Sequence, residues 1–220
     1  MLRITDFDLS YPGYPPLATI QWTVDTGERV ALLGRSGVGK STLLRAILHA
    51  DRHAAIDVQA TQVAYLSQQP ALLPWRSVID NVLLGFYLRG SPITEHLVEH
   101  AHALLDQVGL SDFSKRAIGT LSGGQKARVA LARVLSENAS LILLDEPFSG
   151  LDRSTRIQMA DLCADLLCRH TVILVTHDPR DASDWLNQAM ILNETDLRGP
   201  YQLDAFQDDR ALIAALDGAL

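Results

Sequence analysis

The sequence contains few of the features that mark secreted, membrane-spanning or disulfide-stabilised proteins. Only 2 of its 220 residues are cysteines, too few for the disulfide framework of a small secreted domain. Cys163 and Cys168 lie in a predicted helix at a spacing that points them to different faces, so we expect free thiols. No apolar run is long enough to cross a membrane, and the first residues lack a signal-peptide pattern. These absences predict a cytoplasmic protein.

An excess of positive charge is also absent. The chain has 19 Lys and Arg residues against 26 Asp and Glu, for a net charge of -7. This balance argues against a protein that binds nucleic acid through a basic surface, so we predict no nucleic-acid partner. It does not argue against a bound nucleotide, which backbone N–H groups and one lysine can hold. Apolar residues make up 47% of the chain, enough for the core of one α/β domain.

A phosphate-binding pattern lies near the N-terminus. Its residues are Gly34, Arg35, Ser36, Gly37, Val38, Gly39, Lys40, Ser41 and Thr42, and they match the P-loop pattern G-x-x-x-x-G-K-[ST]. An apolar run over 29–33 predicts a strand before it, and helix formers over 43–48 predict a helix after it. Glycines let the backbone wrap around a polyphosphate at a helix N-terminus. Lys40 can reach the outer phosphates, and the Ser41 hydroxyl is placed to ligate Mg²⁺.

Acidic and imidazole side chains follow two further apolar runs. Asp145 and Glu146 come directly after the run over 141–144, and His177 follows the run over 171–176. Both runs are predicted to be buried strands, and α/β sheets bind their ligands at the carboxyl ends of such strands. Asp145 can hold Mg²⁺, and Glu146 can accept a proton from an attacking water. His177 is predicted to contact the terminal phosphate.

A second anion-binding pattern lies far from the P-loop along the chain. Ser122 is a natural N-cap, and Gly123 and Gly124 expose backbone N–H groups at the start of a helix predicted over 126–135. Gln125 completes the pattern. Its distance in sequence from the P-loop indicates that it cannot easily serve the same phosphates within one subunit.

Three other segments have more than one interpretation. Tyr11, in a proline-rich loop, could stack on a base or pack on the surface. The apolar segment over 71–75 could dock a partner or fold onto its own domain. The segment 96–100 matches the zinc-protease pattern H-x-x-E-H, but we reject a metal site there because no third ligand is evident.

Together these segments resemble the ATP-binding-cassette (ABC) ATPase family over nearly the whole chain. The matching segments are the adenine-stacking aromatic Tyr11, the Walker A segment 34–42, the Q-loop glutamine Gln68, the signature motif 121–125, Walker B 141–146, the D-loop 149–152 and the switch histidine His177. A Walker A segment alone is common to many nucleotide hydrolases. The signature motif followed shortly by Walker B is the specific feature.

The resemblance implies a fold of the α/β class. It predicts a P-loop NTPase core with a mainly parallel sheet, a small antiparallel β subdomain and an α-helical signature subdomain over about 77–135. These parts would form a single domain over 1–220 with no C-terminal regulatory domain. The interval from Lys40 to Gln68 is shorter than in typical members, so the antiparallel β subdomain is expected to be trimmed.

The resemblance also implies roles for the site residues, with ATP and Mg²⁺ as cofactors. Glu146 would be the general base, while His177 and Gln68 would position water and sense the terminal phosphate. Ser41, Gln68 and Asp145 would hold Mg²⁺. Two cassettes would pair head to tail with ATP between them. Ser122, Gly123 and Gly124 of one copy would lie on the terminal phosphate of its partner's nucleotide, and Gln125 and Asp152 are also expected to bind nucleotide.

Within the family, the segment from Gln68 to Asn81 is similar to that of ATPase subunits of bacterial nitrate, sulfonate, taurine and pyrimidine-precursor importers. It departs from that subgroup at Gln125, where a methionine is usual. The likeness implies permease subunits that dock near Gln68–Arg76, a solute-binding protein in the full system, and a peripheral location on the cytoplasmic face of the inner membrane. Alternatives are an exporter ATPase and a non-transport ABC ATPase. A GTP switch is disfavoured because the chain has no Asn-Lys-x-Asp sequence.

Overall fold

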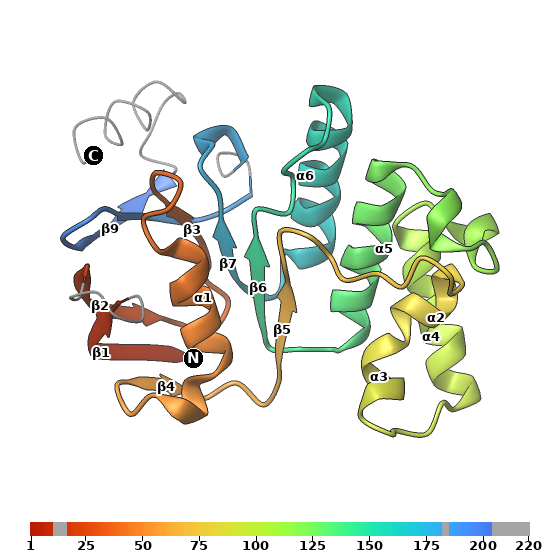
Figure 1. The fold of residues 1–220 in the computed structure, drawn as a ribbon, viewed down its shortest axis with the longest axis horizontal. Helices are drawn as coiled ribbons and strands as arrows, with labels where there is room; N and C mark the ends of the chain where they lie inside the picture. The colour runs from red at the N-terminus through yellow and green to blue at the C-terminus, as the bar shows by residue number, and fades with distance from the viewer. Residues whose placement is uncertain (11–16, 182–184, 204–220) are drawn as a thin grey trace.

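A computed structural model of the chain describes residues 1–10, 17–181 and 185–203. The prediction for Tyr11 lies outside the described residues. Within them, two sheets and a group of helices form the fold, and Figure 1 shows the larger sheet between the smaller sheet and most of the helices. No described helix combines the length and the apolar character that a membrane span requires.

The larger sheet has six strands in the order β5-β6-β7-β3-β8-β9. The strands are β3 (Arg29–Leu33), β5 (Val63–Leu66), β6 (Leu141–Asp145), β7 (Thr171–Val175), β8 (Gln188–Leu192) and β9 (Leu197–Gln202). All neighbours are parallel except β8 and β9, which pair antiparallel. Every residue of β6 and β7 is buried, which explains the continuous apolar runs over 141–144 and 172–175. The predicted mainly parallel core is confirmed.

The smaller sheet is antiparallel and has the order β2-β1-β4. Its strands are β1 (Leu2–Leu9), β2 (Ala18–Val24) and β4 (Ile56–Val58). Buried and exposed residues alternate along β2, as expected of a sheet with one face on the core and one in water. The small antiparallel subdomain is thus present, and its third strand has only 3 residues.

The helices divide between the core and the far side of β5. They are α1 (Lys40–Leu48), α2 (Val78–Val82), α3 (Leu84–Leu88), α4 (Glu95–Gln107), α5 (Gly123–Ser136) and α6 (Arg153–Leu167). Short 3-10 turns span Ala50–Arg52, Ser111–Phe113, Ile118–Thr120 and Pro179–Asp181. In Figure 1, α2 to α5 gather beyond β5, whereas α1 and α6 lie beside the sheet. The Arg128 guanidinium in α5 donates to Val108 O at the end of α4 and to Gln158 Oε1 in α6.

One predicted helix is interrupted. The sequence pattern predicts a continuous helix over 77–88, but the structure ends α2 at Val82 and starts α3 at Leu84. Ser77 caps α2, because its side chain accepts a hydrogen bond from the Asp80 N–H. The second piece contains Gly85, which weakens a helix interior. Both α2 and α3 have the apolar spacing of a helix, so the sequence pattern did not predict a break between them.

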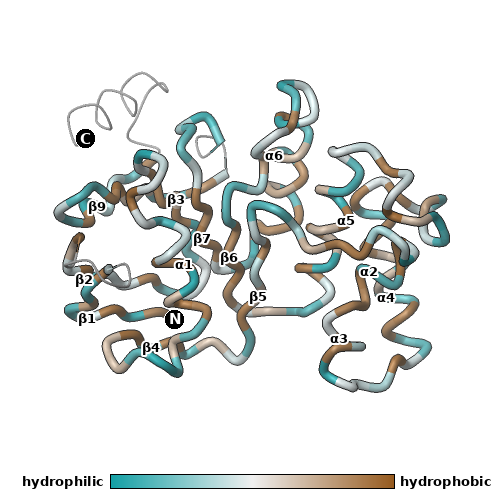
Figure 2. Tube along the Cα trace, viewed as in Figure 1, coloured by the Kyte–Doolittle hydropathy of each residue, from teal (hydrophilic) through white to brown (hydrophobic). Residues whose placement is uncertain are grey.

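The two faces of the larger sheet belong to different hydrophobic clusters. Ile142 and Leu144 pack with the helices of the signature side, whereas Leu141 and Leu143 pack with α1 and the antiparallel sheet. Figure 2 shows the resulting concentration of apolar residues along the central strands. Successive residues of a strand point to opposite faces, so one apolar run supports both layers. This arrangement fixes the carboxyl ends of β3, β6 and β7 along one edge.

Candidate functional site

The P-loop connects β3 to α1 through three glycines with positive φ. Gly34, Gly37 and Gly39 have φ values of 152°, 85° and 106°. A Cβ atom at Gly34 would lie 2.3 Å from the backbone oxygen of Leu192, and one at Gly39 would lie 2.8 Å from Leu9 Cδ2. These positions need glycine both for backbone conformation and for space. The loop is therefore held tightly between the two sheets.

Lys40 is the first residue of α1 and is buried. Its Nζ donates hydrogen bonds to the backbone oxygens of Gly34 at 2.7 Å and Arg35 at 2.8 Å. Burial lowers the pKa of Lys40, and the carboxylates of Glu146 and Asp145 act in the opposite direction. The ammonium group is thus folded back across the loop, where an incoming anion could replace the two carbonyl oxygens.

Asp145 ends β6 and is a buried carboxylate with a donor on each oxygen. The Ser41 hydroxyl donates to Oδ1 at 2.8 Å, and the Tyr65 hydroxyl donates to Oδ2 at 2.9 Å. Burial, followed by the hydrogen bond to Asp145, raises the pKa of Tyr65 to about 12. Ser41 and Asp145 were both predicted from the sequence to hold Mg²⁺, whereas the contact of Tyr65 with Asp145 was not predicted. Only the strand order, which places β5 beside β6, shows that Tyr65 lies near Asp145.

Glu146 brings the three predicted catalytic residues together. Its Oε2 accepts a hydrogen bond from Gln68 Nε2 at 3.1 Å, and its Oε1 lies 3.4 Å from His177 Nδ1. Glu146 has a positive φ of 46°, and its N–H donates to Val175 O at 2.9 Å. The chain thus turns at this residue, directly after the end of β6. A carboxylate between an amide and an imidazole, next to Lys40 and Asp145, can accept a proton from a water beside a bound phosphate.

The turn that carries His177 is braced by an ion network that the sequence analysis missed. Arg156 in α6 binds Asp181 with two hydrogen bonds, Nε to Oδ1 at 2.6 Å and Nη2 to Oδ2 at 2.7 Å. The Thr176 hydroxyl also donates to Asp181. Asp178 pairs with Arg180, which holds the pKa of its carboxyl below the usual value. The network connects α6 to both sides of His177.

Replacing Arg156 by alanine is expected to lower the free energy of unfolding by about 2 kcal/mol, because Asp181 would keep a buried charge without its cation. Asp181 has only 5% of its side chain exposed. The matched control is Arg198→Ala, since the Arg198–Asp196 pair is open to solvent, with 46% of the Asp196 side chain exposed. That change should cost less than about 1 kcal/mol. Urea unfolding of both variants checks this, and equal losses would contradict it.

The signature residues begin α5, far from the P-loop in the chain. The Ser122 Oγ accepts from the Gln125 N–H at 3.2 Å, and Gln125 Oε1 accepts from the Ser122 N–H at 3.0 Å. The two side chains therefore form a capping box. A Cβ atom at Gly123 would meet nothing within 4 Å, whereas one at Gly124 would lie 2.5 Å from Thr155 Cγ2. The N-terminus of α5 is therefore capped, and there is free space beside Gly123.

Asp152 is the N-cap of α6. Its side chain accepts hydrogen bonds from the backbone N–H groups of Ser154 and Thr155 and from both of their hydroxyls. These bonds, led by the one from the Thr155 hydroxyl, hold the pKa of Asp152 below its usual value. Asp152 thus has a structural role as well as the predicted contact with nucleotide.

Two remaining predictions concern cysteines and metals. Both cysteines are free, with Cys163 buried and Cys168 exposed, as their spacing predicts. Across the described residues, no group of three or more His, Cys, Asp or Glu side chains is arranged to hold a metal ion. The Ser41 hydroxyl and the Asp145 carboxylate, which lie within hydrogen-bond distance of each other, are oxygen donors of the kind that Mg²⁺ prefers.

A family model described as ABC transporter matches residues 17–149. The chain belongs to this family. An uncharacterised ABC transporter ATP-binding protein of Haemophilus influenzae is 42% identical, over 83% of this chain and 78% of the relative. Aliphatic sulfonates import ATP-binding protein SsuB 1 of Paracoccus denitrificans is 42% identical, over 82% and 74%. Taurine import ATP-binding protein TauB of Escherichia coli is 39% identical, over 88% and 80%.

A solved structure of an ABC transporter in an inward-facing conformation aligns with a TM-score of 0.82 at 27% identity, covering 99% of this chain and 88% of that one. The ABC chain described here is thus an ATP-binding and ATP-hydrolysing transport subunit, as the motif order predicted. The predicted resemblance to the sulfonate and taurine importer subunits is confirmed.

Proposed function

We propose that this ABC ATPase drives solute import across the bacterial inner membrane by closing with a second cassette around ATP and Mg²⁺. The observation that carries the proposal is the convergence of Gln68 and His177 on Glu146, beside the Ser41–Asp145 pair. The direction of transport is supported by relatives whose names are those of taurine and sulfonate import proteins. The cargo-specific subunits would be separate chains.

The P-loop would hold the phosphates of ATP. The residues from Gly34 to Thr42 would surround them, with Lys40 moving from the loop carbonyls to the outer phosphates. Ser41, Asp145 and Gln68 would hold Mg²⁺, which supplies positive charge to the phosphate oxygens when bound. Tyr11 is proposed to stack on adenine.

Glu146 would act as general base toward the attacking water. Gln68 and His177 would hold its carboxylate in place and contact the water and the terminal phosphate. The turn at Glu146 separates its task from that of Asp145, although the two residues are adjacent. The Asp145 carboxylate would stay in the buried pair with Ser41, whereas the Glu146 carboxylate would extend toward solvent and the incoming nucleotide.

A second copy would complete each site. The N-terminus of α5 would approach the partner's terminal phosphate through Ser122, Gly123 and Gly124, with Gln125 and Asp152 nearby. A two-fold pair then contains two equivalent sites. In this arrangement the chain is one domain over 1–220, in which the helical part over about 77–135 is inserted into the core and carries the signature motif.

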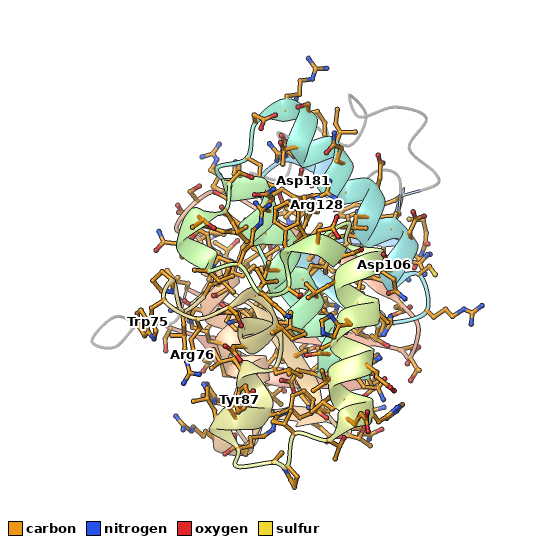
Figure 3. The ribbon with its side chains drawn as sticks, turned by 90° about the vertical axis from the view of Figure 1, so that its right-hand side faces the viewer. Trp75, Arg76, Tyr87, Asp106, Arg128 and Asp181 are labelled. Atoms are coloured by element: carbon orange, nitrogen blue, oxygen red, sulfur yellow. The ribbon has the colours of Figure 1, made fainter. Side chains whose placement is uncertain are left out.

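The permease subunits are proposed to dock beside the Q-loop, near Gln68–Arg76. Trp75 has 74% of its surface exposed, and the large apolar residues Tyr87 and Leu88 of α3 are also exposed. Figure 3 shows Trp75, Arg76 and Tyr87 along the same side of the molecule. This docking would place the cassette on the cytoplasmic face of the inner membrane. A solute-binding protein would complete the system, and no nucleic acid is involved.

Replacing Trp75 by serine is expected to release at least about 90% of the protein from membranes that contain the permease, because a large anchor side chain would be lost from the interface. The matched control is Ile157→Ser, since Ile157 in α6 is 54% exposed but lies outside the proposed docking segment. Quantitative blotting of washed membranes from cells that express the full system measures the bound fraction. Retention of Trp75→Ser at the wild-type level would contradict docking through this residue.

Transport direction has its own experiment. A strain without the chain should fail to take up labelled taurine or an alkanesulfonate, the solutes named for the relatives, if either is the cargo. Complementation by the wild-type chain should restore uptake. Higher accumulation of the solute in the deleted strain would indicate an exporter instead.

A further inference from the structure

Tyr65 lies in the site but has no role in the ATPase mechanism described above. It lies in β5, where it pairs with Leu143, two positions before Asp145 on the neighbouring parallel strand. It packs against the cluster on the α1 side of the sheet, and its hydroxyl donates to Asp145 Oδ2 at 2.9 Å. Tyr65 therefore reaches along the sheet from the next strand to the buried carboxylate at the end of β6.

The hydrogen bond from Tyr65 restricts how the carboxylate can turn. Asp145 has one donor on each oxygen, because Ser41 occupies Oδ1 and Tyr65 occupies Oδ2. A buried carboxylate with a single donor could rotate about its Cβ–Cγ bond and exchange its oxygens. With two donors from two different elements, α1 and β5, its plane is defined before any ligand arrives.

The Tyr65 hydroxyl also lies between two charged groups of opposite sign. The charged groups around it are Asp145 from β6 and Arg45 from α1, one turn after Ser41. A neutral hydroxyl between them adds a directional hydrogen bond without adding charge to the site.

We propose that Tyr65 is a positioning residue for the metal site, because its hydroxyl holds Asp145 in the orientation in which the carboxylate and the Ser41 hydroxyl face Mg²⁺ together. This inference rests on the magnesium site proposed above. Phenylalanine at this position would fill the same volume but leave Asp145 Oδ2 without a donor. An unpaired buried oxygen is unfavourable, so the carboxylate would turn away to find another partner.

The test compares ATP affinity with and without metal in Tyr65→Phe. Isothermal titration of the purified full chain measures the Kd for ATP in EDTA and in excess Mg²⁺. We expect the metal-free Kd to stay within about twofold of wild type, while the tightening by Mg²⁺ falls by about tenfold, the loss that one hydrogen bond to a charged group represents. The Mg²⁺ concentration that half-saturates hydrolysis should rise in parallel.

Two further variants distinguish positioning from packing. Tyr201→Phe, in β9 at the opposite edge of the sheet, is the matched control and should keep the full Mg²⁺ effect. In an Asp145→Asn background, adding Tyr65→Phe should change the Mg²⁺ effect no further, because Tyr65 acts through Asp145. Additive losses in that background would overturn the proposal.

Thermal unfolding of each variant completes the comparison. If Tyr65→Phe lowers Tm but keeps the wild-type tightening by Mg²⁺, then Tyr65 is only a packing residue and the proposal is wrong. If the wild-type chain itself shows no tightening of ATP by Mg²⁺, then the magnesium site is wrong, and the role of Tyr65 is rejected with it. The first outcome leaves the proposed function intact, so the two failures are distinguishable.

Discussion

Replacing Glu146 by glutamine is expected to lower ATP hydrolysis by about two to four orders of magnitude while ATP still binds. Glutamine keeps the length and shape of the side chain that Gln68 and His177 contact. It cannot accept a proton from water, so the step that depends on a base is lost. The phosphate-binding residues are unchanged, and the variant should accumulate as an ATP-bound pair of cassettes.

The measurements are steady-state phosphate release and light scattering with ATP and Mg²⁺. Glu137→Gln is the matched control, because Glu137 lies at the end of α5 in a pair with Arg89, outside the site. It should hydrolyse ATP at close to the wild-type rate. If Glu146→Gln also hydrolysed ATP at that rate, another group would have to take the proton, and the assignment of Glu146 would be abandoned.

Mixing two inactive variants is expected to restore hydrolysis. Lys40→Ala removes the P-loop cation, and Gly123→Asp places a negative charge where α5 is proposed to meet the partner's phosphate. Each variant alone should be inactive. An equal mixture should recover about a quarter of the wild-type rate, because half of the pairs would be mixed and each mixed pair would contain one intact site of two.

The choice of Gly123 keeps this test interpretable. A Cβ atom there would meet nothing within 4 Å, so the variant has space to fold. Aspartate in the first turn is also favourable to a helix, so any loss of activity reports on the nucleotide rather than on α5. As a control, Lys40→Ala mixed with the double variant should stay inactive, since no intact P-loop is present. Undiminished activity of Gly123→Asp alone would contradict the shared site.

The accuracy of the sequence predictions depended on how far apart the interacting residues are along the chain. The P-loop was predicted residue by residue because its glycines, its lysine and the helix that follows are contiguous. The grouping of Glu146 with His177 was predicted from a general property of parallel sheets, whose carboxyl ends share an edge. The break of the helix over 77–88 was not predicted, since both pieces satisfy the same apolar spacing.

The sequence by itself determined the class of fold, the family and the chemical groups of the site. Those properties depend on short contiguous motifs, where strand, turn and helix propensities act over a few residues. Only the tertiary structure decided that Tyr65 contacts Asp145 and that Arg156 braces the turn beside His177. Both contacts join elements that are distant in the chain, and they depend on the order of β5, β6 and β7 and on the packing of α6. Side-chain periodicity reports which face of an element is buried, but it carries no information about which neighbour that face will meet.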